Sequence, residues 1–189
     1  MPTPDQLLAA LAEEVRACRL CTLGEQRKNA VPGEGSSCAK VMFVGEAPGA
    51  DEDEQGRPFV GRAGQLLRQL IDRIKLDSGE YFIGNTLKCR PPGNRDPEPL
   101  EIEACKKWLF AQIAVIKPLV VVILGRHSMG LLLGPKLQIS KVRGQVFERD
   151  GLHFLPTYHP AAILRNPGLR KDIVDDFDKL ALLIKELEQ

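Results

Sequence analysis

Val120-Val-Val-Ile-Leu124 is the stretch that decides the fold, because it is an unbroken apolar run dominated by β-branched side chains. A continuous run of this kind is typical of a parallel strand whose two faces are both covered by helices. Pro118 and Gly125 bound the run on either side and favour a short strand over a buried helix. The stretch therefore predicts a parallel sheet inside a layer of helices.

The segments around this strand complete the pattern of an α/β protein. Helical periodicity alternates along the chain with short apolar runs bounded by glycine and proline. We expect strands at Lys40–Gly45, Tyr81–Gly84, Val120–Leu124 and His153–Thr157, and helices at Asp5–Cys18, Ala63–Ile74, Glu98–Ile116 and in a C-terminal segment containing Ile173 to Leu187. This order predicts a single three-layer domain over residues 1–189, with a central, mostly parallel four-stranded sheet flanked by helices.

Composition narrows the function only a little. The 189 residues are 43% hydrophobic and 27% charged, with a formal net charge of +1. This charge neither requires nor excludes a nucleic-acid partner, so any such binding must use local basic patches. No apolar stretch is long enough to span a bilayer, and the acidic, amphipathic N-terminus does not resemble a signal peptide. We expect a monomer in the cytoplasm, with reduced thiols.

Four polar or flexible residues follow directly after expected strands. These residues are Glu46, Asn85, Gly125 and His159. Ligands of open α/β sheets bind beyond the carboxyl ends of the strands. The sequence therefore predicts that these positions converge on one cleft.

Four of the five cysteines have the spacing of a metal site. Cys18 and Cys21 form a C-x2-C pair, while Cys89 and Cys105 are separated by a proline-rich loop and part of a helix. Four thiolates suit either zinc or an iron–sulfur cluster. The dispersed second half puts the cluster slightly ahead, but spacing alone leaves both open. Cys38 is expected to be an ordinary thiol.

Several loop motifs are not explained by folding requirements. They are Gly45-Glu-Ala-Pro-Gly49, Asp51-Glu-Asp53, Gly56-Arg-Pro-Phe-Val-Gly61, Gly84-Asn-Thr-Leu-Lys-Cys-Arg-Pro-Pro92 and His159-Pro-Ala-Ala162. In this order, from about Cys18 to Arg165, they resemble the family 4 uracil-DNA glycosylases, the iron–sulfur branch of that superfamily. The resemblance implies a base-excision repair hydrolase that flips uracil out of single- or double-stranded DNA and cleaves its N-glycosidic bond. It also implies a [4Fe-4S] cluster on Cys18, Cys21, Cys89 and Cys105.

The resemblance also implies roles for individual pocket residues. Phe59 would stack on the flipped uracil, Asn85 would read its imide edge, and His159 would donate to O2 as the bond breaks. Glu46 would orient or deprotonate the attacking water. Glu52 would exclude the 5-methyl group of thymine, and Ala47 would line the uracil site. The alternatives are ordinary ones, with Phe59 a core residue and Asn85 a turn residue.

Basic residues near the motifs are candidates for DNA contacts. About half of them are expected to be plain surface charges. The candidates are Lys88, Arg90, Arg95, Lys141, Arg143, Arg165, Arg170 and Lys171. Leu164 is a candidate wedge for the gap left in the base stack. His127 and His153 lack a motif, and we expect structural roles for both.

Two other functions fit parts of the sequence. A zinc-containing module that binds nucleic acid without catalysis would explain the cysteines and the basic loops, and a simple electron carrier would explain the cysteines alone. A relative of the family cross-links to uracil-containing DNA through a histidine in a basic loop. The comparable stretch here, Leu137-Gln-Ile-Ser-Lys-Val-Arg-Gly144, has no histidine, so we expect turnover.

Overall fold

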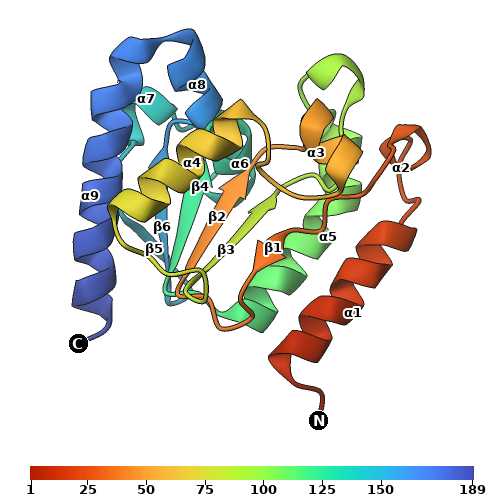
Figure 1. Ribbon diagram of the computed structural model, residues 1–189, viewed down its shortest axis with the longest axis horizontal. Coiled ribbons are helices and arrows are strands. Elements are labelled where there is room, and N and C mark those ends of the chain that lie inside the picture. Colours follow the sequence, from red (N-terminus) through yellow and green to blue (C-terminus); the bar gives the residue numbers. More distant parts are fainter.

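Four parallel strands form the centre of the sheet in a computed structural model that describes residues 1–189. They are β2 (Val41–Gly45), β3 (Tyr81–Asn85), β4 (Val120–Leu124) and β6 (Leu152–Thr157). β2 pairs with β3 and β4, and β4 pairs with β6, all in parallel (Figure 1). The predicted α/β class and all four predicted strands are confirmed, with bounds shifted by one residue at most.

The sheet has six strands, not four, because a short antiparallel strand is added at each edge. β1 (Glu34–Gly35) pairs with β3, and β5 (Phe147–Arg149) pairs with β6, giving the order β1-β3-β2-β4-β6-β5. Strands of two and three residues are too short to produce a period-2 pattern, so the sequence did not reveal them. At β1, a Cβ on Gly35 would lie 2.3 Å from the Tyr81 carbonyl oxygen, so this pairing requires glycine.

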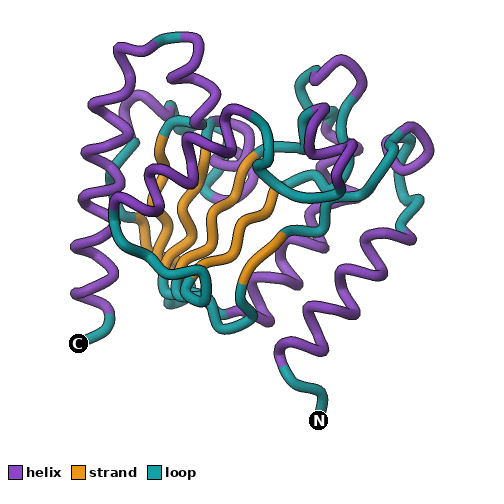
Figure 2. The backbone as a smooth tube through the Cα atoms, viewed as in Figure 1, coloured by secondary structure: helices purple, strands orange, loops and turns teal.

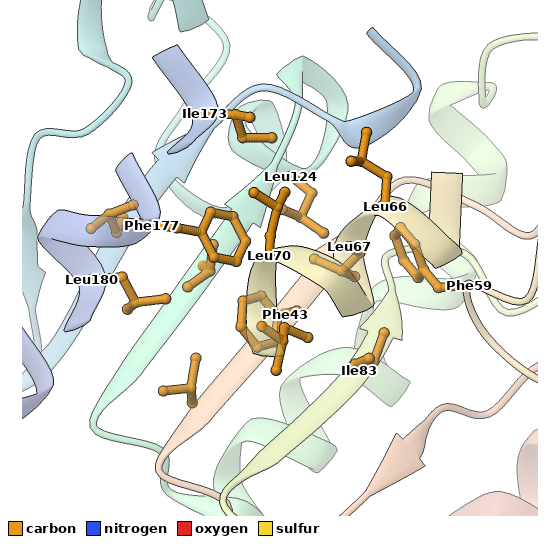
Figure 3. Packing of buried hydrophobic residues seen from close by; sticks show 14 of the residues in the cluster. Phe43, Phe59, Leu66, Leu67, Leu70, Ile83, Leu124, Ile173, Phe177 and Leu180 are labelled. Carbon is orange, nitrogen blue, oxygen red and sulfur yellow. The ribbon is translucent and has the colours of Figure 1, made fainter. Parts of the chain in front are cut away.

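Helices cover both faces of the sheet, as the continuous apolar strands predicted. α4 (Arg62–Arg73), α8 (Pro160–Arg165) and α9 (Arg170–Leu187) cover one face, and α5 (Pro99–Ile116) and α6 (Arg126–Leu132) cover the other (Figures 1 and 2). Phe43 faces the first group, where its ring stacks on Phe177 at 5.8 Å (Figure 3). Met42 faces the second. Complete burial of one such side chain contributes about 1.5–3 kcal/mol.

The N-terminal helix brings two cysteines to α5. α1 (Pro4–Ala17) begins at a capping box formed by Thr3 and Gln6, and it packs along α5. Cys18 follows its last residue, and Cys105 lies on α5. The short elements are α2 (Leu23–Gln26), α3 (Ala50–Gln55), α7 (Ile139–Val142), η1 (Pro92–Asn94) and η2 (Pro167–Leu169). None of the helices is both long and apolar enough to cross a membrane.

Candidate active site

A cavity of about 760 Å³ opens beyond the carboxyl ends of the central strands. All four positions expected to converge line it: Glu46 after β2, Asn85 at the end of β3, Gly125 after β4 and His159 after β6. Because the strands are parallel and in register, the residues that follow them meet at one edge of the sheet. The predicted convergence is confirmed.

Phe59 forms an apolar wall of this cavity. Its backbone has a φ of 53°, which a bulky side chain adopts only where the surroundings force it. Gly64 permits this, since a Cβ there would lie 1.8 Å from the Phe59 carbonyl oxygen. A Cβ on Gly45 would lie 2.7 Å from Cζ of the ring. Phe59 is also part of the core beside Leu66 (Figure 3), so it is at once a core residue and a pocket residue.

Glu52 fixes the loop that carries Phe59. Its Oε1 accepts hydrogen bonds from the backbone N–H groups of Val60 and Gly61, both at 2.9 Å. Its Oε2 accepts from the N–H of Gly49 at 3.0 Å. One carboxylate therefore joins the Gly45–Gly49 loop to the loop after Phe59. Charge-assisted bonds of this kind are roughly twice as strong as neutral ones.

His159 is held as a neutral ring with a defined tautomer. It is the N-cap residue of α8, and its Nδ1 accepts a hydrogen bond from the Ala161 N–H at 3.1 Å. The proton of the neutral ring is therefore on Nε2. Burial lowers the pKa of His159 to about 4, with a further contribution from Arg165, while Glu52 acts in the opposite direction. The ring lies 5.5 Å from that of Phe59, at an angle of 24°.

Asn85 presents a buried acceptor without a partner. The side chain is 2% exposed, and its Oδ1 receives no hydrogen bond within the protein. Buried polar atoms are nearly always paired, so this acceptor is available to a donor group that enters the cavity, from a ligand or from water. Lys88 fixes the backbone here, because its Nζ donates to the Asn85 carbonyl oxygen at 2.9 Å.

Glu46 lines the cavity within a cluster of ionisable groups. His127 Nε2 is 3.6 Å from Glu46 Oε2 and 3.3 Å from Asp96 Oδ1, and Arg126 Nη2 donates to Asp96 at 2.8 Å. Burial raises the pKa of Glu46. His127 lowers it, Asp96 raises it, and Arg126 and Arg165 lower it. A carboxyl group with a raised pKa is suited to proton transfer near neutral pH.

His127 and Asp96 were not expected in this cavity. We expected only a structural role for His127, and its ring lines the cavity beside Glu46. The signal was present, because His127 stands two residues after Gly125 and that strand end was already assigned to the cleft. Asp96 reaches the site from the loop between η1 and α5. A loop has no hydrophobic periodicity, so no signal in the sequence marks this residue. His153 lies elsewhere, with Nδ1 3.3 Å from the Leu119 carbonyl oxygen.

The predicted DNA-binding residues divide into three groups. Arg95 and Arg165 line the cavity, where Arg95 also binds the buried Glu101 carboxylate at 2.6 and 2.9 Å. Leu164 is exposed next to Arg165 on α8. Arg90 and Lys141 lie outside the cavity; Arg90 donates to Asn94, while Lys141 is exposed.

The remaining two basic residues in the central part of the chain point inward. Arg143 Nη1 and Nη2 bind Asp176 and Asp172, at 2.5 and 2.6 Å. Lys88 is 1% exposed, so the expectation of a DNA contact for it is wrong. Arg143 is therefore committed to internal ion pairs, and Lys88 to internal hydrogen bonds.

The four predicted cysteine ligands line a second, smaller pocket between α1 and α5. Cys18, Cys21, Cys89 and Cys105 are all free thiols there, whereas Cys38 is exposed elsewhere. Burial raises the pKa of Cys105 to about 11 and also raises the pKa of Cys89, so as isolated groups these two thiols would remain protonated. A bound metal reverses this, because a coordinating thiol is deprotonated.

Hydrogen-bond donors around the cysteines fit a group with several sulfur acceptors. Arg27 Nη1 donates to Cys89 Sγ at 2.9 Å, and the Lys88 backbone N–H donates to Cys105 Sγ at 3.3 Å. Trp108 also lines the pocket, and its buried Nε1–H has no acceptor within the protein. Metal-bound thiolates and bridging sulfides both accept such hydrogen bonds, so these donors suit a metal centre with sulfur ligands.

Comparison with known proteins identifies the family of this chain. The sequence model of the uracil DNA glycosylase superfamily matches residues 32–182. The type-4 uracil-DNA glycosylase of Sulfurisphaera tokodaii is 50% identical over 183 residues, covering 92% of this chain and 83% of that protein. The type-4 enzyme of Thermotoga maritima is 42% identical over 98% of this chain and 99% of its own length. A type-5 uracil-DNA glycosylase of Pyrobaculum aerophilum is 31% identical over 73% of the chain. The chain therefore belongs to the uracil-DNA glycosylase superfamily, and within it to the type-4 family.

Proposed function

We propose that this protein is a DNA-repair hydrolase that removes uracil from DNA and leaves an abasic site. The observation that carries the proposal is the buried, unpartnered Oδ1 of Asn85 in a cavity walled by Phe59. Uracil carries a hydrogen on N3 and satisfies this acceptor. Cytosine presents a lone pair at N3 and leaves it unsatisfied, at a cost of about 1–3 kcal/mol.

The base must leave the duplex before the pocket can hold it. Flipping costs a few kcal/mol, and stacking on an aromatic ring returns about 1–3 kcal/mol per base. Phe59 supplies this ring in a fixed position, so little ordering is needed on binding. Ala47 lines the same cavity. Glu52, which joins the two loops around Phe59, is proposed to exclude the thymine methyl group.

His159 is proposed as the group that stabilises the departing base. Negative charge develops on uracil as the N-glycosidic bond breaks, and O2 carries part of it. The neutral ring presents Nε2–H, because Nδ1 is occupied by the Ala161 N–H. A donor that is already in position costs no reorganisation during the reaction, and the loss of one such donor slows catalysis by about 10²–10³.

Glu46 is proposed to hold the attacking water and accept its proton. A carboxylate in this place also offsets the positive charge that develops on the sugar. The buried position keeps the pKa of Glu46 above its usual value, which makes it a better base than a solvent-exposed glutamate.

Contacts with DNA are proposed for the basic residues that remain free or line the cavity. Arg95 and Arg165 would bind phosphates next to the flipped nucleotide, while Arg90 and Lys141 would contribute farther along the strand. Leu164 is 42% exposed on the short helix that follows His159, a suitable position for a wedge in the base stack. Arg143 is proposed to have a structural role, because its guanidinium is already bound to Asp172 and Asp176.

A [4Fe-4S] cluster is proposed on Cys18, Cys21, Cys89 and Cys105. When bound, it would supply four metal–thiolate links that join the end of α1, the loop after Asn85 and helix α5. The unpartnered Trp108 Nε1–H and the Arg27 guanidinium would donate to its sulfurs. We also propose that the protein is a cytoplasmic monomer.

The decisive experiment is release of uracil from a labelled oligonucleotide, followed by alkaline cleavage at the abasic site. Matched strands with thymine or cytosine at the same position serve as controls, each single- and double-stranded. We expect cleavage at uracil alone. A folded, iron-containing preparation that leaves uracil in place would overturn the proposal.

A further inference from the structure

Lys88 lies between the two sites, and none of the roles proposed above uses its charge. It is three residues after Asn85 and immediately before Cys89, and its side chain is fully enclosed. Its Nζ donates to the Asn85 carbonyl oxygen at 2.9 Å and to Gln112 Oε1 at 2.7 Å, and Gln112 Nε2 in turn donates to the Pro32 carbonyl oxygen at 2.7 Å. The side chain is therefore held in one orientation.

No carboxylate accompanies this buried ammonium group. Both partners of Nζ are neutral oxygens, and Lys88 takes part in none of the ion pairs of the protein. A buried charge is costly unless an opposite charge compensates for it. Lys88 lines the same pocket as Cys89 and Cys105, and its backbone N–H donates to Cys105 Sγ at 3.3 Å. The compensating negative charge would therefore come from the four cysteines, which a bound metal deprotonates.

We propose that Lys88 is the internal counter-ion of the iron–sulfur cluster and that the same side chain links this cluster to the uracil pocket through the Asn85 backbone. The inference rests on the cluster and the pocket proposed above. A cubane held by four thiolates carries a net negative charge, which would pair with the buried ammonium group. Lys88 is then a positioning residue for Asn85 and an electrostatic determinant of the cluster.

The test of the charge is the reduction potential of the cluster. Lys88→Met removes the ammonium group and keeps a side chain of similar length. Loss of a nearby positive charge disfavours the added electron, so the potential should become more negative. Redox titrations followed by visible absorbance and EPR measure this potential. We expect at least a tenfold change in the ratio of oxidised to reduced protein at a fixed potential, which corresponds to about 59 mV for one electron.

Lys107→Met is the matched control. Lys107 is exposed on the same helix as Cys105, with Nζ 4.3 Å from the centre of the Trp108 ring. The substitution removes the same charge close to the same site, but solvent screens it. Its potential should stay near that of the wild type. Equal shifts in both variants, or no shift in Lys88→Met, would overturn the proposal.

Gln112→Glu provides the same test if Lys88→Met does not fold. It leaves Lys88 in place and puts a carboxylate against Nζ, which neutralises the local charge. The potential should again become more negative. An unchanged or more positive potential in Gln112→Glu would overturn the proposal by itself.

The link to the pocket is tested by single-turnover kinetics. Lys88→Met should slow uracil release at saturating enzyme while binding of uracil-free DNA stays at the wild-type level, because only the Asn85 end of β3 loses its donor. Normal release rates would exclude the link. Wild-type protein distinguishes failure of the inference about Lys88 from failure of the proposed function. If it releases uracil but holds no iron, the inference fails and the proposed function stands. If it holds iron but leaves uracil in place, the proposed function fails and the potentials still decide the role of Lys88.

Discussion

His159 accepts a hydrogen bond at Nδ1 from the backbone N–H of Ala161, two residues along the chain at the start of α8. This bond decides that Nε2 carries the proton of the neutral ring. Burial lowers the pKa of His159 to about 4, with a smaller contribution from Arg165 on the same short helix. At neutral pH the ring is thus an uncharged donor, and it needs no proton from solvent before it can act.

The first prediction concerns this donor. His159→Ala should slow uracil release by about 10²–10³, the usual effect of losing one donor to a developing negative charge. The rate is measured under single-turnover conditions, with binding of uracil-free DNA measured separately and expected to be retained. His153→Ala is the control, because His153 lies at the opposite end of β6 and should release uracil at the wild-type rate. Equal rates for wild type and His159→Ala would remove His159 from the mechanism.

The second prediction concerns the pH dependence of the rate. Glu46 must be ionised to accept a proton from water, and burial raises its pKa above the ordinary value of 4.5. The rate should therefore rise with pH through a midpoint above 4.5 and then level off. His127, Arg126 and Arg165 face Glu46 and lower this pKa, while Asp96 faces it and raises it.

Two substitutions should move that midpoint in opposite directions. His127→Asn removes a group that favours the ionised form, so the midpoint should move to higher pH. Asp96→Asn removes a group that opposes ionisation, so it should move to lower pH. The control is Glu46→Gln, whose residual rate should lack this limb altogether. Shifts of the same sign in both variants would show that Glu46 is not the titrating group.

Much of this architecture was predictable because it depends on local patterns. The run Val120–Leu124 and the residues after each strand fixed the sheet and the place of the cavity, since parallel strands bring their carboxyl ends to one edge. The cysteines were recognisable by residue type and spacing. Glu46, Asn85 and His159 were found because each one follows a strand.

Other features depend on contacts between distant segments, which no local pattern carries. Arg143 looked like a DNA-binding residue in a basic loop, yet it binds Asp172 and Asp176 on α9. Lys88 looked like a surface charge in a polar loop, yet Gln112 on α5 holds it inside. In both cases the partner is more than twenty residues away, so burial of the charge was visible only in the folded chain.

The third prediction concerns the stability of the internal ion pair. Asp176 is fully buried, accepts from Thr157 Oγ1 at 2.7 Å, and is neutralised by Arg143. Arg143→Ala leaves the carboxylate unpaired and should lower the free energy of unfolding by about 3–5 kcal/mol. Urea denaturation measures this. Lys141→Ala, in the same loop but exposed, should leave stability unchanged within about 0.5 kcal/mol. Comparable losses in both variants would contradict a specific role for the Arg143 pair.

The last prediction concerns Glu52, for which sequence and structure indicate two different roles. The resemblance assigns it the exclusion of thymine, whereas the structure gives its carboxylate three backbone N–H partners that join the two loops around Phe59. Glu52→Gln keeps the shape and two of the acceptor contacts, but an amide NH₂ group then faces the Gly49 N–H. We expect a lower rate of uracil release, because the strained Phe59 backbone loses one of the hydrogen bonds that support it.

The two roles of Glu52 separate when the side chain is shortened. Glu52→Gln still fills the space, so thymine should remain excluded. Glu52→Ala opens the space and also frees the loops, so uracil release should fall further, and slow thymine release should appear only if the side chain blocks the methyl group. Competition between uracil- and thymine-containing strands measures both effects. If the three backbone bonds hold Phe59 in place, their loss frees the loop, misaligns Phe59 with His159 and slows uracil release. Full uracil activity in Glu52→Ala would therefore contradict this role of Glu52.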